Sequence, residues 1–295
     1  RMLLLQSELK WLNMEAIRLA YEDMKRIEGF DAVKYLPILT ELEQQVKQGF
    51  GNIYSGDEAV LVNAEKAVAN KRAILLANPL LNGDKILTVR YQLGNRDRRA
   101  MAPELGTQSN NWSNQESARR KGFNADIVEL SNLRDEVQIR TIYKPDNTSS
   151  IADLKLHWDG DRAMFTQTMS DNRWNVFEVK LNNGDCKKLI DNPEPDLEFY
   201  DGTYLPDGRI IANSNIGYQG VPCVNGSDPV GNMVLYTPQS KNLRRLTFDQ
   251  DANWNPVIMN NGRVMYTRWE YTDLTHYYTR IVMNMNPDGT EQKAL

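Results

Sequence analysis

Three Asp-Gly or Asn-Gly dipeptides constrain the fold of this chain more than any other feature. Their glycines are Gly160, Gly208 and Gly262, which lie 48 and 54 residues apart. A dipeptide of this kind between two runs of β-forming residues is a strong signal for a β-hairpin, because its residues tolerate the positive φ of a tight turn. Each hairpin is followed by a second one, with turns at residues 183–184, 239–240 and 288–289. The sequence therefore predicts repeated units of four antiparallel strands.

The distance between these units is typical of β-propeller blades, which repeat about every 40 to 50 residues. An immunoglobulin-like sandwich also consists of short antiparallel strands. A sandwich does not explain why residues 205–211 are echoed by residues 259–265 around equivalent turns. The pattern predicts a mainly β fold of TolB/WD40-like propeller blades, about four in number, and we expect them to form part of a larger propeller. The predicted blades are residues 73–143 with an insertion at 92–124, residues 152–190, residues 197–247 and residues 252–295.

The first part of the chain, residues 1–72, has a helical pattern instead. Apolar residues between positions 5 and 24 recur at three- to five-residue steps, which predicts one amphipathic helix. A second helix is predicted over residues 31–47, and a third, shorter one after Ser55, whose hydroxyl and Glu58 have capping-box spacing. From Ala73 the pattern changes to a predicted β-hairpin that turns at residues 82–83.

Composition excludes several classes of partner and site. A net charge of -4 on 295 residues gives no continuous basic surface for nucleic acid. No apolar run reaches the roughly 18 residues of a membrane span. The two cysteines, Cys186 and Cys223, form neither a CxxC pair nor a CxxCH motif, and the two histidines are too few for a histidine-rich metal site. We predict no cofactor, no metal and two free thiols, because Cys186 and Cys223 fall toward opposite faces of their blades.

Several motifs carry a resemblance to known proteins. The most specific is Tyr-Thr-Arg-Trp-Glu-Tyr at residues 266–271, and the others are residues 204–211, 220–223, 246–250 and 286–290. With its turns, the chain resembles the TolB-type propeller repeat and the hydrazine synthase alpha-subunit-like proteins. The resemblance implies a bacterial protein of the periplasm or cell envelope. The alpha subunit of hydrazine synthase carries haem attached through CxxCH, which this chain lacks, and Thr203 stands where many relatives have a cysteine. The resemblance therefore supports the fold and export rather than hydrazine synthesis.

Loop lengths predict where a ligand would bind. With the four strands of a blade named A to D in chain order, the short A–B and C–D turns lie on one face, which we expect to hold no pocket. The long B–C loops lie on the opposite face, where binding residues are commonly found. The predicted ligand-binding residues are Arg268, Trp269, Glu270, Tyr271, Asp273, His276 and Tyr218. Aromatic rings beside carboxylates suit a neutral glycan or a peptide. The structural alternative is an Arg268–Glu270 ion pair with Trp269 and Tyr271 packed between blades.

Three classes of function follow from this pattern. The preferred one is a binding or scaffold propeller that holds a glycan, peptide or protein partner on the B–C loop face. The second is a glycan-active hydrolase or lyase with acids among Glu198, Asp201 and Asp207, so whether the chain is an enzyme stays open. The third is a subunit of a redox complex. His157, which alternates with leucines, is predicted to be a core or pore histidine.

Overall fold

The computed structural model describes residues 1–81, 85–91, 120, 124–134, 136–146, 149–221, 226, 229–269 and 280–295. Within it the chain forms two compact units. The first contains residues 1–86 with 130–138, and the second contains residues 87–129 with 139–295. The boundary placed by sequence between residues 72 and 73 stays an interpretation.

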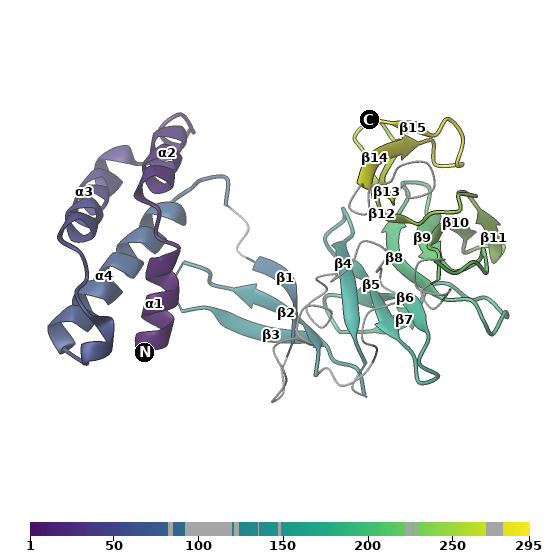
Figure 1. Ribbon diagram of the computed structural model, residues 1–295, viewed down its shortest axis with the longest axis horizontal. Coiled ribbons are helices and arrows are strands. Elements are labelled where there is room, and N and C mark those ends of the chain that lie inside the picture. Colours follow the sequence, from purple (N-terminus) through teal and green to yellow (C-terminus); the bar gives the residue numbers. More distant parts are fainter. Residues whose placement is uncertain are drawn as a thin grey trace. The chain divides into compact units, whose positions relative to one another are not determined.

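The first unit is helical (Figure 1). Its elements are α1 (Met2–Lys10), α2 (Met14–Met24), α3 (Ala32–Gln48), the 3₁₀ helix η1 (Ile53–Ser55) and α4 (Glu58–Leu75). Three of the α-helices begin at side-chain caps, in which Asn13, Asp31 and Asp57 each accept a hydrogen bond from a backbone N–H of the first turn. The Asn13 cap explains why the single helix predicted between residues 5 and 24 is in fact two.

Two further predictions for this unit are wrong. Asp57 caps α4 in place of Ser55, whose hydroxyl donates instead to the Asn52 carbonyl oxygen at 2.7 Å. The helix is also longer than predicted and ends at Leu75, so the hairpin expected from Ala73 does not form at its start. Ile74 explains the difference, because it is fully buried in the helical core on the same stripe as Ala67.

The second unit is built of antiparallel sheets (Figure 1). The first sheet has three described strands, β1 (Lys85–Arg90), β2 (Asp126–Ser131) and β3 (Gln138–Tyr143). The second contains β4 (Ile151–Leu156), β5 (Arg162–Thr168), β6 (Trp174–Lys180) and β7 (Cys186–Lys188). The third contains β8 (Phe199–Tyr204), β9 (Ile210–Ser214), β10 (Asn232–Thr237) and β11 (Asn242–Arg245). The fourth contains β12 (Asn253–Ile258), β13 (Val264–Trp269), β14 (Arg280–Met285) and β15 (Lys293–Ala294).

The last three sheets each have four strands in sequential order, the arrangement of a propeller blade. Their A–B turns contain the predicted glycines. Gly160, Gly208 and Gly262 have φ values of 71°, 84° and 80°, which glycine adopts without strain. The mainly β propeller fold with a helical N-terminal segment is therefore confirmed. Most of the predicted insertion in the first blade lies outside the described residues.

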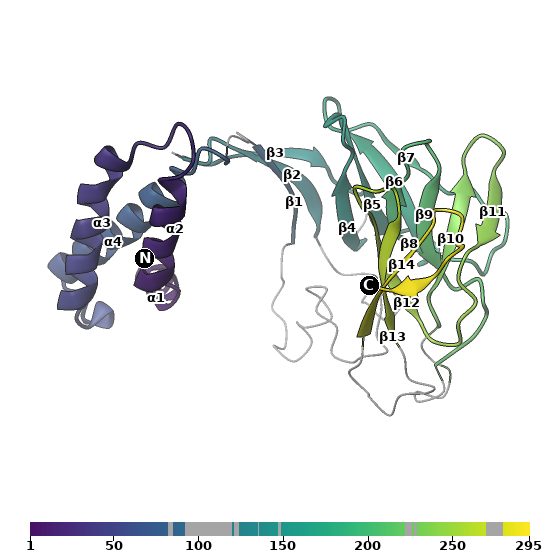
Figure 2. The same cartoon turned by 90° about the horizontal axis from the view of Figure 1, so that it is seen from above.

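The second and third sheets each pack their two faces against different neighbours, and alternation along the strands supplies both cores. In β9, Ala212 packs toward the second sheet, in a cluster with Met164 and Val176. The adjacent Ile211 packs toward the fourth sheet, in a cluster with Val264. Inner strands β4, β8 and β12 contact one another in succession, and Figure 2 shows the sheets following each other around them. We call the line along which these three inner strands meet the axis.

Candidate functional site

The B–C loop face contains the predicted ligand-binding residues that the structure describes. Arg268, near the end of β13, forms an ion pair with Asp249, with 2.7 Å between Nη1 and Oδ1. Trp269 is 1% exposed, and its ring stacks on Trp254 with 6.4 Å between centroids. Trp269 is therefore buried, as the structural alternative predicted. Arg268 is ion-paired, but its described partner is Asp249 in the connection before β12. Glu270, Tyr271, Asp273 and His276 lie outside the described residues.

A buried aromatic cluster lies beneath this face. It contains rings from the second, third and fourth sheets, at the strand ends that point away from the A–B turns. Its members are Trp174, Tyr200, Val221, Val230, Ala252, Trp254 and Trp269. The ring faces of two members are covered by guanidinium groups, Arg120 over Trp174 and Arg280 over Trp254, with 5.9 and 4.8 Å to the ring centroids. The cluster forms a rigid base for the loops.

Two aromatic side chains of the third blade are exposed on the same side. Tyr218, in the B–C loop, is 64% exposed and has a φ of 50°. Phe248, in the connection to the next blade, is 72% exposed and has the Arg245 guanidinium 4.9 Å from its ring centroid. A Cβ on Gly217 would lie 3.2 Å from the same guanidinium, so the two exposed segments flank Arg245. We call Tyr218, Arg245 and Phe248 the aromatic patch.

A second site, made of polar residues, lies along the axis. The sequence alone did not predict a site there. The inner strands β4, β8 and β12 each have a shift of register near their middle. At these bulges Asp153, Asp201 and Asn255 have φ values of 53°, 50° and 57°. Backbone in this region turns the peptide groups out of the ladder, so they become free to bond the neighbouring blade. We call these three residues with Lys155 the axial cluster.

Asp201 is the centre of the axial cluster and is 5% exposed. Its Oδ1 accepts from the Lys155 ammonium at 2.8 Å, and its Oδ2 accepts from the backbone N–H of Asn255 at 2.7 Å. The amide of Asn213 donates to the same Oδ2 at 3.3 Å. One carboxylate therefore connects the second, third and fourth blades through charge-assisted hydrogen bonds.

Asp153 occupies the equivalent position one blade earlier, where hydrogen bonds from the Thr166 hydroxyl and the Asp201 backbone satisfy it only in part. Its Oδ2 is buried and has no hydrogen-bond partner among the described residues. Burial, with a smaller contribution from the negative charge of Asp201, raises the pKa of Asp153 from 3.8 to about 7, and Lys155 and the Thr166 hydroxyl oppose this rise. The axial cluster therefore holds a carboxyl group that titrates near neutral pH. The signal that could have revealed it is positional, because each of the three bulge residues lies seven positions before its turn glycine.

The acids named for a glycosidase mechanism do not converge. Glu198 forms an ion pair with Arg120, and Asp207 forms one with Arg209 at 2.6 Å in the A–B turn. Asp207 lies on the turn face, whereas Glu198 precedes β8 at the opposite end of the sheet. Among these three acids, Asp201 alone belongs to the axial cluster. Their arrangement does not supply the facing pair of carboxyl groups that glycoside hydrolysis requires.

The expectation that the turn face holds no pocket is wrong. A cavity of about 440 Å³ opens there between the second and third blades. Its wall includes Trp158, which is 56% exposed, and Tyr204, whose hydroxyl donates to the Glu178 carboxylate at 3.0 Å. Trp158 and Tyr204 stand in a T-shaped arrangement in this wall, with 6.1 Å between ring centroids. Turn length therefore did not predict the free volume on this face.

His157, at the base of that cavity, is 6% exposed, as expected for a core histidine. Its Nδ1 faces the backbone N–H of Asp159 at 3.1 Å, and its Nε2 lies 2.7 Å from the Arg162 guanidinium. His157, Asp159 and Asp161 lie close enough to share a metal ion. The Arg162 guanidinium already bonds both carboxylates, at 3.3 and 2.7 Å, so a cationic group takes the place of an ion.

Cys186 is a free thiol, as predicted, and burial raises its pKa to about 11. Cys223 lies outside the described residues. A thiol with a raised pKa carries little thiolate at neutral pH and is therefore a poor nucleophile. None of the helices in the described part of the chain is long and apolar enough to cross a bilayer.

The repeated four-stranded sheets, their glycine turns and the bulged inner strands define a fold of β-propeller blades. A hydrazine synthase from Kuenenia stuttgartiensis is similar over 72% of this chain and 31% of its own, with a TM-score of 0.50 and 10% identity. TolB from Acinetobacter baumannii is similar over 61% of this chain and 38% of its own, with a TM-score of 0.42 and 15% identity. At 10% identity the likeness to the hydrazine synthase shows the fold alone. No family model matches the chain, and neither does any curated protein.

Proposed function

We propose that this chain is a binding or scaffold propeller that works outside the cytoplasm and holds a glycan, a peptide or a partner protein on its B–C loop face. The aromatic patch is the observation that carries the proposal. Tyr218 and Phe248 expose 64% and 72% of their surface beside the Arg245 guanidinium. Exposed rings with a polar neighbour supply stacking area and hydrogen bonds together, as binding surfaces commonly do.

The base beneath the patch supports the same role. Trp174, Trp254 and Trp269 are nearly completely buried and come from different strands of the second and fourth blades. A packed aromatic base fixes the ends of the strands that carry the loops, and preorganisation lowers the entropic cost of binding. Glu270, Tyr271, Asp273 and His276 directly follow Trp269 in the sequence, and we keep them in the proposed site.

A neutral polar ligand suits the patch better than an anion does. The Arg268 guanidinium is already paired with Asp249, and Arg245 donates through Nε to the Thr247 carbonyl oxygen at 2.8 Å. A sugar ring can stack its C–H face on Tyr218 or Phe248 without breaking these contacts. The same surface accepts a peptide side chain.

The test compares two aromatic substitutions on opposite faces. Tyr218→Ala with Phe248→Ala removes the two rings of the patch, and Trp158→Ala removes a ring from the turn face that is 56% exposed. Binding of each purified variant to glycan and peptide arrays is measured together with its melting temperature. We expect the patch variant to lose binding at an unchanged melting temperature and the Trp158 variant to bind as the parent does. Binding that survives the loss of both patch rings would disprove the location, and loss in the Trp158 variant alone would move the site to the turn face.

Export is tested separately by fractionating bacteria that produce the protein from its complete gene. The proposal requires recovery in the periplasmic or envelope fraction. Recovery with the cytoplasmic marker enzymes contradicts that part of the proposal and leaves the binding face untouched.

A further inference from the structure

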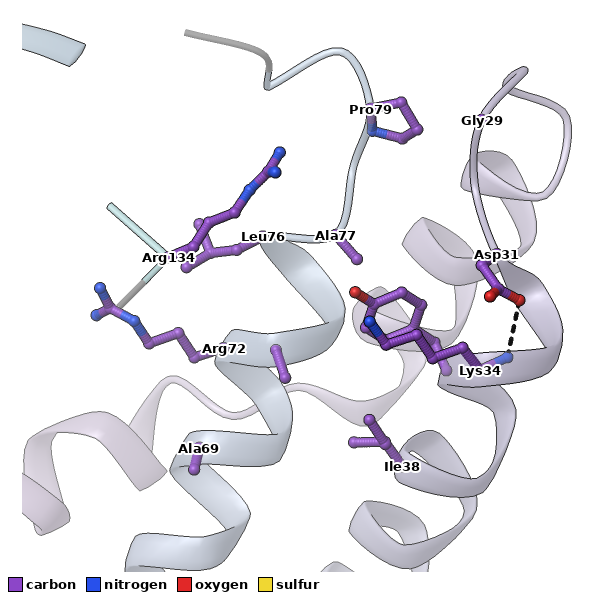
Figure 3. Close-up of a pocket in the computed structure, with 12 residues that line it drawn as sticks. Gly29, Asp31, Lys34, Ile38, Ala69, Arg72, Leu76, Ala77, Pro79 and Arg134 are labelled. Atoms are coloured by element: carbon purple, nitrogen blue, oxygen red, sulfur yellow. Dashed lines mark hydrogen bonds between the residues drawn. The ribbon is translucent and has the colours of Figure 1, made fainter. Parts of the chain in front are cut away.

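The helical unit contains its own cavity, of about 770 Å³, between α3, α4 and the turn after β2 (Figure 3). Small residues of α4 leave the space open, since Ala69 and Ala73 lie where longer side chains would fill it. Ile38, Leu76 and Pro79 complete an apolar wall. A cavity of this size is in the range that small-molecule ligands occupy.

Three cationic side chains line the same cavity: Lys34, Arg72 and Arg134. None of them forms an ion pair with a described carboxylate. Asp31 is the one acidic residue of the lining, and its Oδ1 is engaged in capping α3 through the Lys34 backbone N–H at 3.0 Å. The cavity therefore has an excess of positive charge in a chain whose net charge is -4.

The positions of these cations are fixed from different elements. Figure 3 shows Lys34 extending from α3 across the cavity and Arg134 extending beside Leu76, at the end of α4. Arg72 donates to the Leu133 carbonyl oxygen at 2.8 Å and so holds the turn that carries Arg134. Arg72 is thus a positioning residue. Arg134 makes one longer contact, from Nη2 to the Leu81 carbonyl oxygen at 3.5 Å, and the Lys34 ammonium lies 5.2 Å from the centroid of the Tyr35 ring. Both side chains keep further N–H groups for a ligand. Their guanidinium and ammonium groups are the usual partners of carboxylate and phosphate oxygens.

We propose that this cavity binds a small amphiphilic anion. Its carboxylate or phosphate head contacts Lys34 and Arg134, and its apolar tail lies along the wall formed by Ala69, Ala73 and Leu76. The two parts of the lining decide this chemistry together. A purely inorganic anion would leave the apolar wall in contact with water, and a neutral lipid would leave the cations without a negative charge to pair with. This site is independent of the B–C loop face.

The experiment is calorimetric titration of the whole chain with four probes below their micelle concentrations. Octanoate and octyl phosphate carry head and tail, inorganic phosphate carries only charge, and octyl glucoside carries only the tail. We expect both octyl anions to bind at least tenfold more tightly than either partial probe, with affinity that falls as salt rises. Equal binding of octyl glucoside, or no binding by any probe, would overturn the proposal.

Four variants test the two halves of the site. Lys34→Gln and Arg134→Gln are each expected to weaken octanoate binding five- to tenfold, whereas Lys47→Gln, also on α3 but outside the cavity, should leave it unchanged. Ala73→Phe fills the cavity from an exposed helix position and should abolish binding of the octyl tail while inorganic phosphate binding is retained. If Lys47→Gln weakened octanoate binding as much as Lys34→Gln does, the anion would be responding to the overall charge and not to this cavity. That result would contradict the proposal.

A lipid surface could present the same head and tail, and vesicles distinguish that source. Vesicles of phosphatidylglycerol and of phosphatidylcholine are pelleted with the parent and the Arg134→Gln variant. The proposal expects no pelleting at a salt concentration where free octanoate still binds. Pelleting with the anionic vesicles, lost in the variant and unaffected by saturating octanoate, would replace the free anion by a membrane surface.

Discussion

Asp153→Asn is expected to stabilise the protein above neutral pH and to leave its stability unchanged in acid. In the folded protein the pKa of Asp153 rises from 3.8 to about 7, chiefly because its carboxyl group is buried. Folded protein therefore holds a proton that unfolded protein releases between about pH 4 and pH 7. Since stability falls with pH wherever the folded state binds more protons, this group lowers the free energy of unfolding across that window and by a constant amount above it.

The magnitude follows from the size of the pKa rise. One pKa unit corresponds to about 1.4 kcal/mol, so a rise of about three units sets an upper limit of about 4 kcal/mol for the cost of the buried charge. The coupling to Asp201 and partial relaxation reduce the gain, and we expect about 1 to 3 kcal/mol at pH 8. Asparagine keeps an oxygen that accepts from Thr166 and carries no charge, so no new cavity or clash accompanies the change.

Urea unfolding followed by tryptophan fluorescence measures this difference at several pH values from 4 to 8.5. Most described tryptophans, including Trp174 and Trp254, belong to the propeller unit and report its unfolding. The control is Asp207→Asn, because a hydrogen bond from Arg209 lowers the pKa of this exposed turn acid and its replacement should give no gain at pH 8. The reasoning fails if the Asp153 variant and the parent differ by the same amount at pH 4 and at pH 8, or if the variant is less stable throughout.

Three other substitutions or reactions test separate parts of the structure. Gly231→Ala should lower the free energy of unfolding by about 1 to 3 kcal/mol and with it the melting temperature. The added Cβ would lie 2.6 Å from the Tyr200 hydroxyl and 3.2 Å from Trp254 Nε1. An unchanged melting temperature would contradict this packing. Ile74→Ala should lower the free energy of unfolding of the helical unit by about 2 to 5 kcal/mol, because Ile74 is fully buried. Denaturant unfolding followed by circular dichroism measures this loss. A negligible loss would favour the hairpin that the sequence predicted at this position. Cys186 should react slowly with a thiol reagent in native protein and rapidly in urea, since burial raises its pKa to about 11; equal rates would show that the thiol is accessible.

The turns were predictable from sequence because their cause is local. A glycine such as Gly208, with a φ of 84°, is favoured at the last position of a three-residue hairpin loop, here residues 206–208, so the dipeptide alone reports the hairpin. The helical unit was predicted less well, since the residues at the end of α4 have local patterns typical of both a helix and a strand. Residues 73–76 are apolar enough for a strand, and only the position of Ile74 on the buried stripe of α4 decides for the helix.

The repeated spacing to the turn glycines marks the bulge residues of the axial cluster, but the contacts among these residues could not be predicted, for a different reason. Its contacts join residues that are far apart in the chain, as Lys155 and Asp201 show with their ion pair across 46 positions. Which carboxylates meet depends on the order of the blades and on the bulges of the inner strands, and neither is encoded near the residues themselves. The cavity at Trp158 has the same origin, because residues of two adjacent blades line it together.

The repeat also separates residues that specify the fold from residues that are free to acquire a role. The inner strands β4, β8 and β12 each keep a bulge residue in the left-handed region seven positions before the turn glycine. The residue two positions after that bulge changes from Lys155 to Thr203 to Val257. The bulge and the turn are determined by backbone geometry, so all three blades share them. The side chain beside the bulge points toward the neighbouring blade or the axis without altering the strand, and it can change from a cation to a hydroxyl or an apolar group. Chemical differences between blades therefore arise at such positions and in the B–C loops, while the turns keep the architecture constant.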